Sequence, residues 1–355
     1  MPLWTLLLPA AAAALLGVAI AAPMGTLLAA ACAAALTGAV IASVHHAEVI
    51  AHTVGEPFGT LVLALAVTVI ECALILSMML SGGPEQRALP RDTIFAAIMI
   101  ICNGVVGVCL LLGGLRHREQ VFRIEGANSA LAGLVTLAAL TLVLPKFTTS
   151  SPGPTYTAAQ LGFAAIASLT VWAVFVFVQT VRHRDYFLPP AGSRDESAHA
   201  PPPSAAHAWA SFGLLLVSLV AVVGLAKMLS PAIEAAVARA GAPKAVIGIA
   251  IAMIVLLPET LSAVRAARRG LLQTSMNLAL GSALATIGLT IPAVVVTSIV
   301  LDLPLVLGLP AKEMVLLALA LLLTSTTVAS GRATVLQGVV HLVVFAVFLF
   351  LAMVP

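Results

Sequence analysis

The stretch LVLALAVTVIECALILSMM, residues 61–79, is almost unbroken hydrocarbon and carries a single carboxylate, Glu71. About 20 consecutive apolar residues are needed for a helix to cross a bilayer. Only helices and closed barrels satisfy their backbone in lipid, and this run is continuous rather than alternating, so it predicts a transmembrane helix. A charge at the centre of such a helix is costly, which makes Glu71 a candidate functional residue.

The composition extends this prediction to the whole chain. Of the 355 residues, 61% are hydrophobic and only 9% are charged, whereas a soluble domain has about 25% charged residues. The net charge of +3 comes without a basic run suited to nucleic acid. No nucleotide-binding loop is present, so ATP is not expected to drive the protein. The four cysteines lie inside apolar runs and form no metal-binding or disulfide spacing.

Apolar runs long enough to span a membrane recur along the sequence. A linker rich in proline, serine and charge, residues 182–207, divides them into two groups. We predict an all-α polytopic membrane protein with about eleven transmembrane helices. The expected spans are 4–21, 25–44, 58–81, 93–114, 127–145, 158–181, 209–229, 245–265, 274–300, 312–329 and 334–353.

The two groups of helices resemble each other. ALAVTVIECAL (64–74) and AMIVLLPETLS (252–262) each place one glutamate, Glu71 and Glu259, at the same point of an apolar run. The run after each contains Asn-x-x-x-Gly, beginning at Asn103 and at Asn277. Five helices per group is an odd number, so the second group enters the membrane from the opposite face. This pattern predicts the inverted repeats that many secondary transporters use.

These observations give a domain plan. Residues 1–22 form an extra N-terminal transmembrane helix, 23–181 the first five-helix repeat, 182–207 a cytoplasmic linker and 208–355 the second repeat. With the linker in the cytoplasm, ten of the seventeen Lys and Arg residues fall on that side, as the positive-inside rule requires. The N-terminus is then cytoplasmic and the C-terminus periplasmic.

Two desolvated carboxylates suggest an exchange site. They take up protons readily, and a divalent cation neutralises both. Ca²⁺ takes six to eight oxygens, which we expect from Glu71, Glu259, Asn103, Asn277, Thr68 and Ser282, with backbone and water. A site that binds cation and protons in turn, and opens to one side at a time, is an antiporter. Inorganic cations, protons and the lipid bilayer are its expected partners.

A second polar group allows other hypotheses. In HHAEVIAHTVGEP (45–57), His45, Glu48 and His52 share one helical face. They are expected, with Glu56, to form a solvated, titratable segment at the cytoplasmic mouth. An intramembrane metalloenzyme using His45, Glu48 and His52 is the alternative from another class. It predicts essential histidines and dispensable glutamates, whereas a scaffold protein tolerates Glu→Gln at both acids.

Three stretches, GEPFGTLVLALAVTVIE (55–71), VLLPETLSAVRAA (255–267) and QTSMNLALGSALATIGLTIP (273–292), resemble the bacterial calcium/proton antiporters of the calcium/cation antiporter superfamily. The likeness is to the ChaA-type branch. It implies a non-enzymatic carrier with a ten-helix core, alternating access, no resident cofactor, a place in the bacterial inner membrane and one essential acid per repeat, here Glu71 and Glu259.

The resemblance has one departure and leaves one alternative. Plant-type members carry Gly-Asn-x-x-Glu, whereas Thr68 and Leu256 stand three residues before the acids. The ChaA branch is also associated with Na⁺ and K⁺, so Na⁺(K⁺)/H⁺ exchange at the same site remains the alternative to Ca²⁺/H⁺ exchange.

Overall fold

The computed structural model describes residues 2–55, 58–81, 87–188, 203–241, 243 and 245–354. Its contacts divide the chain into two compact units. The first unit comprises Met1–Gln86 and His199–Pro258, and the second unit comprises Arg87–Ala198 and Glu259–Pro355. Each unit therefore takes helices from both halves of the sequence.

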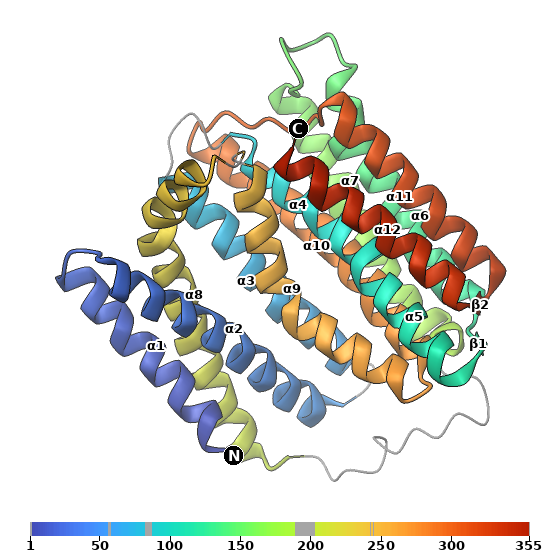
Figure 1. Cartoon of the computed structure of the whole chain (residues 1–355), viewed down its shortest axis with the longest axis horizontal. Coiled ribbons are helices and arrows are strands. Elements are labelled where there is room, and N and C mark those ends of the chain that lie inside the picture. The colour runs from blue at the N-terminus through green and yellow to red at the C-terminus, as the bar shows by residue number, and fades with distance from the viewer. Residues whose placement is uncertain are drawn as a thin grey trace. The chain divides into compact units, whose positions relative to one another are not determined.

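The first unit contains α1 (Leu3–Ala21), α2 (Thr26–Val54), α3 (Phe58–Ser81), α8 (Ala205–Arg239) and the beginning of α9 (Ala245–Arg268). Helices α1, α2 and α8 pack against one another, and α3 packs against α2 and α8 (Figure 1). The contact between α1 and α8 is close, because a Cβ on Gly224 would lie 2.5 Å from the Leu16 side chain. Small residues at such points let transmembrane helices approach.

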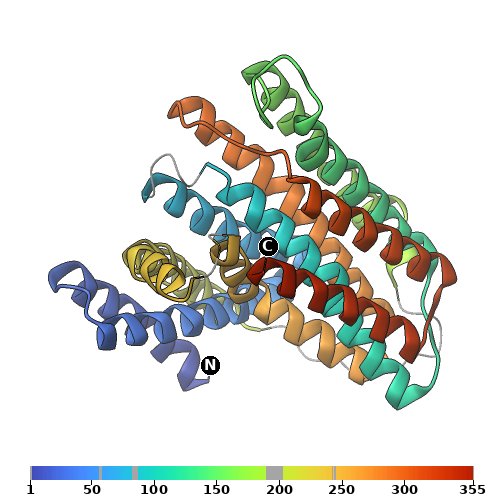
Figure 2. The same cartoon turned by 45° about the horizontal axis from the view of Figure 1, so that its top comes forward.

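The second unit is a bundle of long helices (Figures 1 and 2). Its segments from the first repeat are α4 (Leu89–Met99), η2 (Ile100–Val105), α5 (Val106–His117), β1 (Gln120–Val121), α6 (Ile124–Ala138), η3 (Ala139–Val143), η4 (Leu144–Lys146), α7 (Ala158–Phe177), η5 (Val178–Arg182) and η6 (Arg184–Phe187). Those from the second repeat are the rest of α9, α10 (Leu272–Val300), α11 (Ala311–Ser330), β2 (Arg332–Ala333) and α12 (Val335–Met353).

Two spans form the centre of the second unit. In its most apolar window, the continuous segment Leu89–His117 is 89% buried, and α10 is 61% buried. These are the third helices of the two repeats. Helix α5 packs against α12, α10 packs against α7, and α6 packs against α11. The third helix of each repeat thus contacts the fifth helix of the other repeat. Such reciprocal contacts are expected when two inverted repeats are related by a two-fold axis.

The connections of the second unit gather at two ends. At the strand end, β1 pairs with β2 in antiparallel register. The Arg123 amide donates to Gln273 Oε1 at 2.6 Å, and its guanidinium donates to the Asp185 carbonyl at 2.7 Å. The connections α5–α6, α9–α10 and α11–α12 and the start of the linker therefore meet here.

The other end, which we call the loop end, gathers the remaining connections. The amides of Val306, Gly308 and Leu309 donate to the carbonyls of Arg87, Pro154 and Leu142 at 2.8–3.0 Å. The Tyr156 hydroxyl donates to the Leu140 carbonyl at 2.7 Å, and burial raises the pKa of this hydroxyl. Successive connections alternate between the two ends, so the described helices of this bundle cross it from end to end.

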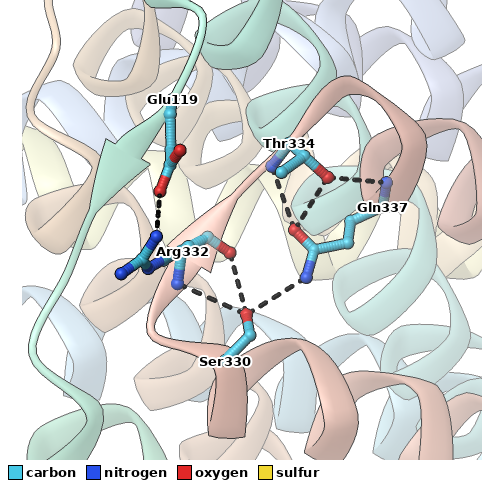
Figure 3. A network of polar contacts seen from close by, with 5 residues as sticks. All are labelled: Glu119, Ser330, Arg332, Thr334 and Gln337. Carbon is cyan, nitrogen blue, oxygen red and sulfur yellow. Dashed lines mark hydrogen bonds and ion pairs between the residues drawn. The ribbon is translucent and has the colours of Figure 1, made fainter.

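A polar network fixes the turn at the strand end (Figure 3). Helix α11 stops at Gly331, which has a φ of +62° that favours glycine. Thr334 and Gln337 then form a capping box that starts α12. Ser330 accepts from Gln337 Nε2 at 3.1 Å, and Arg332 of β2 pairs at 3.0 Å with Glu119, the residue before β1.

Each expected span falls on a helix, but the count of eleven membrane crossings is not confirmed. Within the described residues, nine helices are long and apolar enough to cross a membrane, and a tenth follows if the bent α9 is one span. Two predicted ends were wrong. Helix α2 continues to Val54 rather than ending at 44, and α8 covers Ala205–Arg239 rather than 209–229. Polar side chains near the ends of both helices suggested loops.

Candidate cation site

Glu71 lies on the buried face of α3. Its side chain is 3% exposed, and Thr68, one turn earlier on the same face, is 4% exposed. Ile70 and Leu74 are also buried there, whereas Val69 is 47% exposed on the opposite face. The apolar periodicity of α3 thus directs the carboxylate of Glu71 and the hydroxyl of Thr68 to the interior.

Glu259 lies where α9 passes from the first unit to the second. Pro258 precedes it and has no backbone N–H, so one helical hydrogen bond is missing at this point. The Ser282 hydroxyl of α10 donates to Glu259 Oε2. Both residues are half-buried. The structure therefore brings together two of the residues predicted for the site.

The two acids occupy equivalent places in their helices. Helices α3 and α9 both have 24 residues, and each acid lies near the middle. Glu71 belongs to the first unit and Glu259 to the second. In each repeat, therefore, the second helix carries one interior carboxylate among apolar residues.

Asn103 lies at the centre of the most buried span. It is fully buried in the π-helical turn η2, and neither atom of its amide has a hydrogen-bond partner among the described residues. A buried unpaired amide is costly, and π-helical turns are frequent at functional sites. The amide is thus available for a ligand, although its role as one remains a prediction.

Asn277 is not placed like Asn103, although both begin an Asn-x-x-x-Gly motif. It lies in the second turn of α10, near the strand end. Its Nδ2 donates to the Phe187 carbonyl at 2.6 Å, and its Oδ1 accepts from Gln273 at 2.9 Å. Asn103 lies 14 residues after Leu89, where its span begins. The residue at the same distance from Leu272, the start of α10, is Thr286, which is 2% exposed. The Asn-x-x-x-Gly motif therefore does not identify Thr286 as the residue that stands where Asn103 does.

We expect Asn277→Ala to release residues 184–188 from α10. Losing the hydrogen bond to Phe187 should speed amide-hydrogen exchange in this segment about tenfold. Exchange mass spectrometry of the purified protein measures it. Unchanged exchange rates, together with a complete loss of transport, would instead assign Asn277 to the cation.

The second polar group lies on α2, because residues 45–54 continue this helix beyond the predicted end at 44. His45 is half-buried with its ring 5.1 Å from that of Trp4, and His46, fully buried, has Nε2 at 2.9 Å from the Thr5 carbonyl. Among the described residues, no three His, Cys, Asp or Glu side chains are arranged to hold a metal ion. The roles predicted for His45, Glu48 and His52 remain predictions, and Glu56 lies outside the described residues.

A nearly all-helical bundle of membrane-length helices, with one carboxylate near the middle of α3 and of α9, fits the inverted-repeat architecture predicted for a secondary transporter. The chain belongs to the sodium/calcium exchanger protein family, which it matches over residues 23–181 and 210–354. The class inferred from the helices and the family found by comparison therefore agree.

Similar proteins extend this result. The chain is 49% identical to a putative ionic transporter, y4hA, of Sinorhizobium fredii, over 88% of this chain and 85% of that protein. It is 35% identical to the sodium-potassium/proton antiporter ChaA of Escherichia coli, over 86% and 83%. The structure matches native YfkE with a TM-score of 0.75 and 17% identity, covering 99% of this chain and 100% of that one. A second matching crystal structure of YfkE describes YfkE as a Ca²⁺/H⁺ antiporter. The likeness to YfkE shows the fold.

Proposed function

We propose that this protein is a secondary antiporter that exchanges Ca²⁺ for H⁺ by alternating access. Glu71 and Glu259 bind the cation and protons in turn, and Thr68, Ser282 and Asn103 supply further oxygens. The observation that carries the proposal is one carboxylate near the middle of each of the apolar helices α3 and α9, in a chain of the exchanger family. The proton gradient drives exchange, with no resident cofactor and no enzymatic step.

One observation favours a second candidate cation. ChaA, at 35% identity, is named a sodium-potassium/proton antiporter. Two carboxylates that bind Ca²⁺ through several oxygens also accept a monovalent cation with one proton. Na⁺ or K⁺ in exchange for H⁺ is therefore the alternative, with the same residues in the same roles.

Proteoliposomes distinguish these candidates. A pH gradient is imposed across vesicles that contain the purified protein and a trapped pH-sensitive dye, and Ca²⁺, Na⁺ and K⁺ are added separately. Collapse of the gradient with Ca²⁺ supports the first proposal, and collapse with Na⁺ or K⁺ alone supports the second. A gradient that no cation collapses, in correctly inserted protein, would overturn both.

We further propose that the strand end faces the cytoplasm of a bacterium, with the chain in its inner membrane. Basic residues concentrate at the strand end, as the positive-inside rule requires of a cytoplasmic face. The strand end carries Arg116, Arg118, Arg123, Arg182, Arg184, Arg265, Arg268, Arg269 and Arg332, whereas the loop end carries Arg87, Arg91, Lys146 and Lys312. Because α12 runs from the strand end to the loop end, its last residues are then periplasmic.

Cysteine labelling tests this orientation. In a variant without the four native cysteines, we expect Asp302→Cys, at the loop end, to react with a membrane-impermeant maleimide in intact cells. Arg269→Cys, at the strand end, should react only after the inner membrane is permeabilised. Both side chains are exposed, so their reactivity reports sidedness. The opposite pattern would invert the proposed topology.

A further inference from the structure

His341 is a buried ionisable residue to which the proposed mechanism gives no part. It is fully buried in α12 and is the one ionisable side chain in the sequence of that helix. Ionisable groups inside membrane spans are costly and usually functional, and a partner on a neighbouring helix is the first thing to seek. The structure supplies that partner.

The imidazole of His341 joins three segments of the second unit. Its Nε2 lies 3.0 Å from Thr327 Oγ1 of α11, and Thr327 is itself 1% exposed. Its Nδ1 makes no hydrogen bond of ordinary geometry with the described residues, and the ring lies within reach of the Cys102 backbone carbonyl. Cys102 is in the π-helical turn η2, immediately before Asn103.

Two glycines, one in η2 and one in the first turn of α5, let α12 lie close against this part of the span. A Cβ on Gly107 would lie 3.0 Å from the Cβ of His341, and a Cβ on Gly104 would lie 3.4 Å from the Phe345 ring. Such small residues let two helices approach closely. Because α12 lies against both η2 and the first turn of α5, which continues directly from η2, a change in the position of His341 acts on the helix that carries Asn103.

The π-helical turn needs such support. Its geometry interrupts the regular helical hydrogen-bond ladder, and it holds the Asn103 amide buried with no partner among the described residues. Without support from a neighbouring helix, the turn would lower its free energy by relaxing so that the Asn103 amide finds a hydrogen-bond partner. A rigid imidazole anchored to Thr327 opposes this relaxation.

We propose that His341 and Thr327 form a positioning pair that holds η2, and so keeps the Asn103 amide directed at the transported cation. The inference rests on the proposed function, in which Asn103 is a cation ligand. His341 does not touch the cation. It sets the affinity for the cation by fixing the turn that carries the ligand.

The pair is present in one repeat only. The equivalent fifth helix of the first repeat, α7, packs against α10, but the sequence of α7 contains no histidine. Instead, a Cβ on Gly288 of α10 would meet Trp172 at 2.8 Å. The third helix of the second repeat, α10, has no π-helical turn, so of the two third helices the one with the turn is the one that packs against a histidine.

Transport kinetics test the inference. In proteoliposomes, His341→Leu should raise the KM for the transported cation about tenfold, the effect of losing one buried hydrogen bond, and leave kcat unchanged. Thr327→Val removes the same bond while keeping the histidine, so it should raise KM equally. His341→Gln places an amide near the position of Nε2 and should restore most of the affinity. Ser168→Ala, which removes a fully buried hydroxyl on α7 without a partner among the described residues, should leave KM unchanged.

Two results would overturn the positioning role. One is a wild-type KM in either His341→Leu or Thr327→Val. The other is a fall in kcat and protein yield that His341→Gln does not rescue, which would show a structural role alone. Glu259→Gln in the same vesicles tests the proposed function separately. If that variant is inactive while His341→Leu keeps a wild-type KM, the positioning inference fails and the antiporter stands.

Discussion

Replacing either interior glutamate by glutamine should abolish exchange. Glu71→Gln and Glu259→Gln keep the size and hydrogen-bonding capacity of the side chain but remove the charge and the proton that it carries. A site with one carboxylate cannot alternate between the cation and protons with the same charge balance. We expect cation-driven collapse of the pH gradient to fall at least about 100-fold, because even outer-shell changes cost metal sites up to that factor.

The controls separate loss of chemistry from loss of fold. Glu125→Gln changes an exposed acid in the first turn of α6, so exchange should stay at the wild-type level. Ca²⁺ binding, measured by calorimetry in detergent, should weaken in both interior variants and stay unchanged in Glu125→Gln. Exchange that persists in either Glu71→Gln or Glu259→Gln, at normal protein levels, would show that this carboxylate is not the shared site.

The helices could be predicted from the sequence because a lipid environment requires continuous apolar runs. Two of the predicted helix ends, however, were wrong. The polar residues His45, Glu48 and His52 suggested that the membrane span ends at residue 44. In the structure α1 lies against this part of α2, and the Thr5 carbonyl bonds His46. This tertiary contact lets α2 continue through polar residues beyond residue 44.

A repeated signal in the sequence does mark those ends. Glu48 is followed by glycine seven residues later and by proline nine residues later, and Glu234 is followed in the same way. The glycines, Gly55 and Gly241, have φ values of +76° and +65°, which glycine adopts readily and which are not compatible with a continuing right-handed helix. This Glu-x₆-Gly-x-Pro motif occurs at the ends of α2 and α8, the first helices of the two repeats, and both helices belong to the first unit.

The site remains a prediction, but the structure shows which of its residues the sequence could place. The glutamates could be found because a charge in a 24-residue apolar helix is conspicuous. The pairing of Asn103 with Asn277 failed as a structural equivalence, because one short motif does not report where a residue stands along its helix. Thr286 and the π-helical turn around Asn103 leave no mark in composition or periodicity, since a π turn depends on how neighbouring helices pack.

Gly338→Ala should strongly destabilise the second unit. A Cβ on Gly338 of α12 would lie 2.5 Å from the Leu111 amide nitrogen and 2.8 Å from its Cα on α5. Both are backbone atoms, so no side-chain rotation relieves the clash, and α12 must move away from α5 and η2. Overpacking typically costs about 1–3 kcal/mol, and here it also disturbs the contacts of Gly107 and His341. We expect a clearly lower midpoint of thermal unfolding in detergent.

Gly162→Ala provides the matched control, because a Cβ on Gly162 of α7 would meet nothing within 4 Å. Alanine is the better helix former by about 1 kcal/mol, so this variant should unfold at the wild-type temperature or above it. A wild-type midpoint in Gly338→Ala would show that α12 does not lie directly on α5. That result would also remove the close contact through which His341 is proposed to hold η2, so the two variants test the packing on which the positioning pair depends.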